Sequence, residues 1–589
     1  MKKLVLAFLI SVFFFASIRT QAQGYNTLPD SATKKMDSAM NAILVKTKMM
    51  GASIAIVNDG QIVYSKGYGF ADKNKNVRAT GKTCYGIGST TKTFTAMAIM
   101  KLRDEGKIDL EKPASYYVPE LTIKSLVETG DILKIKNLLS HTSGLTDGFL
   151  NNDACKNYVD FNTVINDLNQ TVMVHKANWK FSYSNVGFDL LGVIIEHVTH
   201  MKYEDYIRQN FLDKMEMTHS GFYIHPEDSN FSKGYKDNVE TAEPVLRDMP
   251  AGRLFCSPED MAHFMQMVMN NGMYKGVQIL SAQALKDMET SHVEDTRLYE
   301  APMYGYGMFF KYMHNQEDSI YGTGVGHPGD TYVFHSGCQM FPKVKLGFVL
   351  LTNTDKGYMF CSSGFTSLFN IWMKYVKGIK LHPLPATAPD KNKTYGTGLT
   401  ADDMVGNYAT GEDIHIVVRK INENKLIVKQ DNQHFILKRQ ENGSWSFTLR
   451  IMYLFKKKIP DFAFAFEKVD GNIYLESIQG KYKRVSYDLV KDNPIPLSQE
   501  WKKTVGKYTL LNSCEGNQQG LPEEIFIKGN KLYLKMRFDK KHVENYSFNA
   551  VNDTMAAIDG IDRYSGMIMK ILPNGHVYFS GYEMVKKGE

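Results

Sequence analysis

The sequence predicts an α/β (α+β) domain followed by two small antiparallel β-barrel or β-sandwich domains. Three observations support this prediction. The chain has 589 residues, which is too many for a single hydrophobic core. Helical and strand patterns mix over residues 24–380, whereas short strand patterns fill the remainder. A stretch with three prolines at 381–400 separates the two regions and predicts a linker.

Residues 1–23 have the pattern of a signal peptide. Lys2 and Lys3 precede an apolar run, Leu4 to Ile18, which is too short to span a bilayer comfortably, and small and polar residues follow it. A membrane anchor is the alternative interpretation of the same run. The signal-peptide interpretation predicts a periplasmic or secreted protein without stable membrane insertion.

The composition argues against several classes of protein. Removal of residues 1–23 takes away Lys2, Lys3 and Arg19 and no acidic residue, so the formal net charge falls from +7 to +4. This weak, dispersed charge does not favour nucleic-acid binding. No group of His, Cys and Asp has metal-ligand spacing, so we expect neither a metal nor a cofactor. The six cysteines are far apart, and we expect mostly buried thiols, with the pairing of any disulfides left open.

Four segments of the first domain have clear local patterns. Residues 52–69 contain two β-rich runs around an Asn-Asp-Gly sequence, which predicts a hairpin. An apolar run predicts a helix from Thr93 that ends near Gly106, and residues 185–199 predict a second helix with an apolar stripe. Residues 345–354 predict a buried strand.

Two modules, 401–490 and 501–589, follow the linker. Each contains short, closely spaced strand patterns, and a break with two prolines covers residues 491–500. These patterns predict two antiparallel β domains.

Short sequence words recur between the two modules. Val-Gly-Asn-Tyr at 405–408 is echoed by Val-Gly-Lys-Tyr at 505–508, and Asn-Lys-Leu at 424–426 recurs at 530–532. We interpret the modules as related copies of one fold. A chance match of short words is the alternative.

Ser89 and Lys92 stand one helical turn apart at the mouth of the first predicted helix. Residues three apart share a helix face, so the amine of Lys92 can point towards Ser89. The helix start favours negative charge on the serine oxygen, and apolar neighbours favour a neutral lysine that accepts the serine proton. Ser31 and Lys34 have the same spacing, but we expect a solvated helix start there, capped by Asp30 or Ser31. The S-x-x-K spacing alone therefore does not identify a catalytic pair, and the surrounding sequence must decide.

The order of motifs resembles the serine β-lactamase and penicillin-binding superfamily, in its class C and peptidase S12 branch. YGIGSTTKTFTA at 85–96 is similar to the nucleophile segment, YSN at 183–185 to the Y-x-N motif, and HPG at 327–329 to the third motif. The segments at 135–145 and 250–265 are also typical of the family. The resemblance implies a β-lactamase/transpeptidase-like catalytic domain over 24–380. The two C-terminal domains resemble the β-barrel or lipocalin-like modules of D-aminopeptidases.

The resemblance implies the roles of three catalytic residues. Ser89 would be the nucleophile. Lys92 would orient and deprotonate it, or share that work with Tyr183. A phenol is a poor base at its ordinary pKa near 10, but a neighbouring ammonium favours the phenolate.

Four positions would bind the substrate in the same scheme. Asn185 would hydrogen-bond the substrate amide and the catalytic lysine. His327, where β-lactamases of this type have a lysine, would contact a substrate carboxylate or assist the catalytic tyrosine. Gly329 would leave room for a substrate along the strand. The backbone N–H groups of Asp330 and of the nucleophile would form the oxyanion hole.

The implied function is that of an exported serine hydrolase. It would form an acyl-enzyme on amide or ester bonds of a small-molecule or peptide substrate. A D-aminopeptidase-like or carboxypeptidase-like peptidase and a carboxylesterase both fit this description. A non-catalytic penicillin-binding-like binding or sensing protein and a weak β-lactamase are the alternatives. His327 in place of lysine argues against a dedicated β-lactamase.

Two further features lead to conditional expectations. Arg253 stands where many relatives have a glycine, and it would bind an acidic group if it faces the cleft. Residues 514–523 form an insert that the first β module lacks. We expect this insert to enter the cleft and to limit the size of the substrate.

Overall fold

The computed structural model describes most of residues 27–588. It leaves out residues 128–132, 174, 224–229, 294–295, 297, 299–303, 311–320, 382–393, 410–414, 431–432, 452–454, 480–483, 492–494, 518–519, 540, 559 and 561–563. The predicted signal peptide and most of the predicted linker therefore lie outside the described residues. Within the part that is described, none of the helices is both long enough and apolar enough to cross a bilayer.

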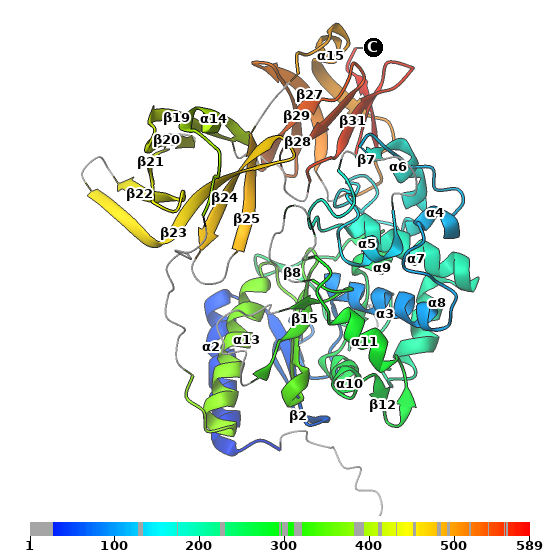
Figure 1. The fold of residues 1–589 in the computed structure, drawn as a ribbon. Helices are drawn as coiled ribbons and strands as arrows, with labels where there is room; N and C mark the ends of the chain where they lie inside the picture. Colours follow the sequence, from blue (N-terminus) through cyan, green and yellow to red (C-terminus); the bar gives the residue numbers. More distant parts are fainter. Residues whose placement is uncertain are drawn as a thin grey trace, which may run out of the picture.

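A seven-stranded antiparallel sheet forms the centre of the first domain (Figure 1). Its strands, in spatial order, are β14 (Phe309–Phe310), β15 (Val325–Asp330), β16 (His335–Phe341), β17 (Leu346–Thr352), β1 (Gly51–Asn58), β2 (Gln61–Asp72) and β3 (Val77–Arg78). The predicted hairpin is confirmed as β1 and β2. Asp59 and Gly60 both have positive φ, 50° and 74°, as a two-residue turn of this kind requires. The predicted strand at 345–354 is confirmed as β17.

Helices cover both faces of this sheet. On one face, Ile54 and Ile56 of β1 pack in a core with α2 (Asp30–Thr47) and α13 (Tyr358–Ile371), which lie side by side in Figure 1. On the other face, Ala55 and Val57 pack in a larger core that contains α10 (Pro258–Met269). Successive residues of a strand point to opposite faces, so the near-continuous apolar run of β1 matches its burial on both sides.

The larger core continues into a helical region around α3 (Thr91–Asp104) and α7 (Asn185–Thr199). The prediction of α7 is confirmed at both ends, and α3 begins two residues before the predicted start. The other helices here are α4 (Ala114–Tyr117), α5 (Ile135–Leu139), α6 (Val164–Gln170), α8 (Tyr203–Ile207), α9 (Met249–Gly252) and α11 (Ala282–Met288). Eleven of the fourteen residues of α3 are buried, so its side chains are held rigidly on all sides.

The predicted cap of α2 is wrong, although a helix does start there. Pro29 occupies the N-cap position, and no side chain caps the helix. A proline fits at this position because its fixed φ is compatible with the helix entry and no intrahelical bond needs its missing N–H.

The two C-terminal modules are closed eight-stranded barrels, so the barrel prediction is confirmed over the sandwich. The first consists of β18 (Gly406–Ala409), β19 (His415–Asn422), β20 (Lys425–Gln430), β21 (Gln433–Arg439), β22 (Trp445–Ile451), β23 (Phe455–Val469), β24 (Asn472–Gln479) and β25 (Arg484–Lys491). The second consists of β26 (Gly506–Leu510), β27 (Leu521–Lys528), β28 (Lys531–Arg537), β29 (Val543–Ala550), β30 (Met555–Ile558), β31 (Ile568–Ile571), β32 (Val577–Phe579) and β33 (Tyr582–Lys586).

The recurring words lie at equivalent places in the two barrels. Each Val-Gly-x-Tyr leads into the first strand, and each Asn-Lys-Leu starts the third. A short helix precedes each barrel, α14 (Ala401–Met404) and α15 (Gln499–Lys503). The Tyr408 hydroxyl donates to the carbonyl of Met404, and the Tyr508 hydroxyl donates to that of Thr504. The same tyrosine thus ties the same helix end to each barrel, which supports the interpretation as related copies.

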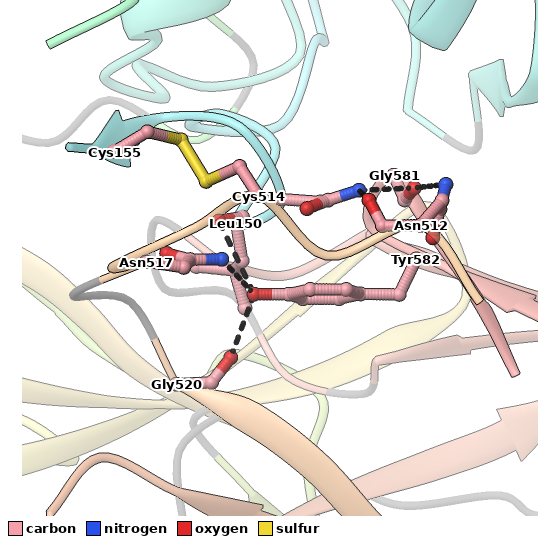
Figure 2. The surroundings of a disulfide bond; sticks show 9 residues. Leu150, Cys155, Asn512, Cys514, Asn517, Gly520, Gly581 and Tyr582 are labelled. Carbon is pink, nitrogen blue, oxygen red and sulfur yellow. Dashed lines mark hydrogen bonds between the residues drawn. A yellow bond between two sulfur atoms is a disulfide. The ribbon is translucent and has the colours of Figure 1, made fainter. Parts of the chain in front are cut away.

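A disulfide links the first domain to the second barrel. Cys155 and Cys514, 359 residues apart in sequence, are bonded, and Figure 2 shows the surrounding contacts. The other four cysteines, Cys84, Cys256, Cys338 and Cys361, are buried free thiols. The expectation of mostly buried thiols is therefore confirmed, and the pairing left open by the sequence is resolved.

The cysteine arrangement can be checked by counting thiols. Alkylation of the oxidised protein in denaturant should modify four cysteines before reduction and six after it, as measured by intact mass. A Cys514→Ser variant should instead show five thiols before reduction, because Cys155 loses its partner. Six reactive thiols in the oxidised wild-type protein would contradict the bond.

Candidate active site

Ser89 lies in a tight turn that leads directly into α3. The turn, Gly88–Thr90, is a single turn of 3₁₀-helix, and Gly88 has a φ of 50°. A Cβ atom on Gly88 would lie 2.6 Å from the backbone nitrogen of Asp330. The Thr90 hydroxyl also donates to the carbonyl of His327 at 3.0 Å. The nucleophile turn and the end of β15 are therefore in direct contact, and Gly88 is required for both its φ and its small size.

Gly329 is needed for this same contact. A Cβ atom on Gly329 would lie 1.9 Å from the carbonyl oxygen of Ile87. We expected this glycine to leave room for a substrate, but the space beside it is filled by the nucleophile turn. The space beside Gly329 is filled because β15 packs directly against the nucleophile turn. Asp330, the last residue of β15, is thereby brought next to Ser89.

Lys92, the second residue of α3, is fully buried, and its amine joins three segments of the chain. Nζ lies 3.1 Å from Ser89 Oγ, 2.6 Å from Asn185 Oδ1 and 2.7 Å from the carbonyl oxygen of Ala251. Three acceptors match the three protons of an ammonium. They match a neutral amine equally well, because its two protons can go to Asn185 and Ala251 while its lone pair faces the Ser89 hydroxyl.

Aromatic rings surround the same amine. Lys92 Nζ lies 4.9 Å from the ring centroid of Tyr183 and 5.7 Å from that of Phe188. The faces of these rings stabilise the charged form of the lysine. Tyr183 is in turn packed on His141, with ring centroids 4.2 Å apart, and His141 Nδ1 accepts a hydrogen bond from the backbone nitrogen of Ser184 at 3.0 Å. The Tyr183 ring is thereby placed beside Lys92, as the sequence predicted.

Asn185 is oriented by its position at the first residue of α7. Ser184 caps this helix, accepting a hydrogen bond from the backbone nitrogen of Gly187 at 3.0 Å. Asn185 Nδ2 donates to Asp147 Oδ1 at 3.2 Å, which leaves Oδ1 directed at Lys92. The side-chain amide thus has a defined orientation, with its oxygen on the lysine.

His327 is buried and neutral. Burial first, and the charge of Lys92 second, lower the pKa of His327 to about 3. Its Nδ1 donates to the carbonyl of Pro328, and its Nε2 accepts from the Tyr304 hydroxyl at 3.3 Å. Both ring nitrogens are therefore used within the protein. Two roles were expected for His327. Contact with a substrate carboxylate does not fit this position. Assistance to Tyr183 does fit, because the two ring centroids lie 6.2 Å apart.

A cavity of about 340 Å³ opens beside Ser89. Of the predicted site residues, Ser89, Asn185 and Asp330 line it. The other lining residues are Asp153, Leu246, Asp248, Ala251, Gly252, Thr331 and Tyr332. Tyr183 and His327 are not among the lining residues; the Tyr183 ring lies beside Lys92, and the His327 ring lies beside Tyr183. The described residues of the insert at 514–523 do not line the cavity, residues 518–519 lie outside the described part, and the entry of the insert into the cleft stays a prediction.

The sequence did not single out Asp153 and Asp248, two of the three aspartates that line this cavity. Asp248 directly precedes α9 and accepts a hydrogen bond from Arg247 Nε at 3.3 Å. Asp189, on α7, is fully buried next to Asp248; burial first and the adjacent Asp248 carboxyl second raise the pKa of Asp189 well above its usual range. Asp248 could have been noticed through its place just before the PAGR segment. For Asp153 no sequence signal existed.

Arg253 does not line the cavity. Its guanidinium lies between two tyrosine rings, 4.5 Å from the centroid of Tyr158 and 5.5 Å from that of Tyr223. Stacking on both sides is a stable environment for this planar cation. The expected role in binding an acidic group is therefore not met at the cavity beside Ser89.

The arrangement provides the parts that acyl transfer requires. A serine hydroxyl at a helix start faces a cavity, a buried lysine contacts its oxygen, and the backbone of Asp330 lies against the nucleophile turn. Backbone N–H groups at such a position can stabilise negative charge that develops on a substrate oxygen.

Comparisons with known proteins agree with this geometry. A sequence model of the family described as Beta-lactamase matches residues 33–361. Protein flp of Staphylococcus aureus (strain N315) is 32% identical over 348 residues, which are 56% of this chain and 65% of flp. The chain therefore spans slightly less than two thirds of that relative.

Two solved structures share the fold. The octameric penicillin-binding protein homologue from Pyrococcus abyssi is 24% identical with a TM-score of 0.51, and SurE, in its crystal structure with D-Leu, is 18% identical with a TM-score of 0.55. Each comparison covers 78% of this chain and 100% of the other.

The neutral state of His327 has a measurable consequence. Because its folded-state pKa lies far below its ordinary value near 6.5, the unfolded chain takes up a proton as the pH falls and the folded protein does not. The stability from this residue is thus complete above pH 6.5 and decreases below it, by on the order of 1–2 kcal/mol at pH 5. We expect the loss of melting temperature between pH 7.5 and 5 to be smaller in His327→Gln. An NMR titration of the folded protein with a His327 midpoint near 6.5 would contradict this assignment.

Proposed function

The chain belongs to the β-lactamase family, as its motifs predicted, and we propose that it is an exported serine hydrolase that acts through an acyl-enzyme on Ser89. Members of this family are generally serine hydrolases. The observation that carries the proposal is the 3.1 Å contact between Ser89 Oγ and the buried amine of Lys92, on the wall of a cavity.

The chemistry follows from the contacts of this pair. In its neutral form, Lys92 accepts the Ser89 proton while Oγ bonds to the substrate carbonyl carbon. Tyr183, beside the lysine, shares this proton transfer. The N–H groups of Ser89 and Asp330 donate to the carbonyl oxygen as it becomes negative. The bond to the leaving amine or alcohol then breaks, and the leaving group takes the proton from Lys92. Water, deprotonated by the same base, hydrolyses the acyl-enzyme.

Asn185 contributes by fixing the base. Its Oδ1 accepts from Lys92, and its amide is held from behind by Asp147. A base held by two acceptors at 2.6 and 2.7 Å has little freedom to turn away from Ser89.

The proposed substrates are peptides, amino-acid amides or carboxylic esters. SurE, which shares the fold, has been crystallised with D-Leu, and this supports substrates that contain D-amino acids. The cavity and His327 both weigh against β-lactams as the main substrates. Among the described residues that line the cavity there is no lysine or arginine, and both ring nitrogens of His327 are engaged within the protein, so the described lining offers no cationic anchor for a β-lactam carboxylate.

Export is supported by two independent features. The first is the signal-peptide pattern of residues 1–23. The second is the bond between Cys155 and Cys514, because structural disulfides form and persist in oxidising compartments. We propose a periplasmic or secreted location.

Labelling with a fluorophosphonate tests the nucleophile. The wild-type protein should be labelled, and Ser89→Ala should lose the label completely, because the probe reacts only with an activated serine. Ser31→Ala is a matched control, since Ser31 has the same spacing to a lysine but is exposed in α2. Equal labelling of wild type and Ser89→Ala would show that the nucleophile is wrong. A folded wild-type protein that reacts with neither fluorophosphonate nor activated esters would be a binding protein.

Gly88→Ala tests the contact between the nucleophile turn and β15. The new Cβ would meet the backbone nitrogen of Asp330, so the turn and the oxyanion donors must separate. Loss of one oxyanion donor costs about 10²-fold or more in rate, and we expect a decrease of at least about tenfold in the rate of labelling. Gly60→Ala is the control, because Gly60 also has a positive φ but no atom within 4 Å of the added Cβ. Equal labelling rates in the two variants would refute the role of this contact.

A further inference from the structure

The second barrel holds one short segment of the first domain, residues 150–156, which we call the clamped segment. Asn151 is fully buried, and its side chain donates to the carbonyls of Asn512 and Gly581 at 3.0 and 2.9 Å. The backbone nitrogens of Leu150 and Asn151 donate to Ser580, to its hydroxyl and its carbonyl respectively.

The other end of the clamped segment is fixed covalently. Cys155 is bonded to Cys514, and the backbone nitrogen of Lys156 donates to the carbonyl of Glu515 at 2.9 Å. Figure 2 shows the disulfide together with Tyr582, whose hydroxyl donates to the carbonyl of Leu150 at 3.4 Å. Backbone groups, a buried amide and a disulfide thus all fix the position of these few residues.

The clamped segment is also part of the wall of the active-site cavity. Ala154 and Cys155 pair as a short antiparallel strand with Val245 and Leu246. The backbone nitrogen of Arg247 donates to the carbonyl of Asp153 at 2.7 Å. Asp153 lines the cavity together with Leu246 and Asp248. The second barrel therefore affects the cavity indirectly, because it fixes the clamped segment, which contains Asp153.

Carboxylates dominate the described lining of the cavity. Asp153, Asp248 and Asp330 line it together with Ser89, and none of the described lining residues is a lysine or an arginine. The amine of Lys92, which contacts Ser89 Oγ, is buried and hydrogen-bonded to Asn185 and to the carbonyl of Ala251. The nearest guanidinium, that of Arg247, is fully buried, paired with Asp167 at 2.8 Å and with Asp248 at 3.3 Å. A substrate group that enters beside Ser89 therefore meets carboxylates, and a cation is the group that complements them.

We propose that the second barrel determines substrate charge preference, by fixing the clamped segment so that Asp153 faces the Ser89 cavity and binds a positively charged group next to the scissile bond. The inference rests on the proposed serine-hydrolase function. It identifies the substrate class as amides or esters that carry a free ammonium near the carbonyl, such as amino-acid amides or peptides cleaved from a free amino end. Asp153 is the specificity residue, and Asn151 and Cys514 are positioning residues.

Matched substrates test the role of Asp153. We would compare kcat/KM for alanine p-nitroanilide with a free α-amino group and for its N-acetyl derivative, with D- and L-alanine, at pH 7, where the amine is mostly charged. The wild type should prefer the free amine. Asp153→Asn should lower this preference by about tenfold or more, because a hydrogen bond between charged groups is lost. Asp213→Asn, which changes an exposed carboxylate that does not line the cavity, should leave it unchanged.

A double-mutant cycle tests the role of the barrel. Cys514→Ser and Asn151→Ala should each lower the preference towards that of Asp153→Asn, and neither should lower it further once Asp153 is replaced, because they act through it. Circular dichroism and melting temperature establish that each variant is folded. Two outcomes would overturn the role of the barrel. In the first, Cys514→Ser and Asn151→Ala leave the preference for the free amine unchanged. In the second, their effects add to that of Asp153→Asn.

Two failures remain distinguishable. If fluorophosphonate labels Ser89 but the wild type prefers the acetylated substrate, or Asp153→Asn does not change the ratio, the charge preference is refuted and the hydrolase function stands. If the wild type is not labelled and cleaves neither substrate, the proposed function itself fails.

Discussion

The site depends on the burial of one amine. Lys92 Nζ is removed from water and surrounded by oxygens from the nucleophile turn, α7 and α9, namely those of Ser89, Asn185 and Ala251. A buried amine is costly unless its hydrogen bonds are made, so each of these segments must sit where it does. The hydrogen bonds of the Lys92 amine are made possible by three features: the burial of α3, the capped start of α7 and the short helix α9. The cavity lies where the surrounding walls leave Ser89 accessible to solvent.

Much of the fold could be predicted because local patterns and tertiary packing agree. The Asn-Asp-Gly turn, the apolar run of β17 and the capped start of α7 each specify one structure, and the structure contains it. Ser89, Lys92, Tyr183 and Asn185 could be placed together because the order of motifs fixed the family. The N-cap of α2 was missed because Pro29 precedes side chains that are better caps on average.

The parts that could not be predicted come from contacts between distant segments. The lowered pKa of His327 comes from its burial and then from Lys92, which is far from it in sequence, and Tyr304, also distant, hydrogen-bonds its ring. The need for glycine at 329 depends on where Ile87 lies. Asp153 lies in a segment that is held both by the backbone nitrogen of Arg247 and by the second barrel, which are far from it in sequence. Amino-acid composition and motif spacing carry no information about contacts between such distant segments.

The disulfide also sets an order of events. Cys155 lies in the first domain, and its partner follows 359 residues later, in the second barrel. Ser89, Lys92 and Asn185 all precede the linker, whereas the disulfide and the hydrogen bonds that hold the clamped segment need residues of the second barrel. During synthesis, the contacts that hold the segment of Asp153 therefore become available only after the second barrel has been made, long after the residues of the nucleophile turn.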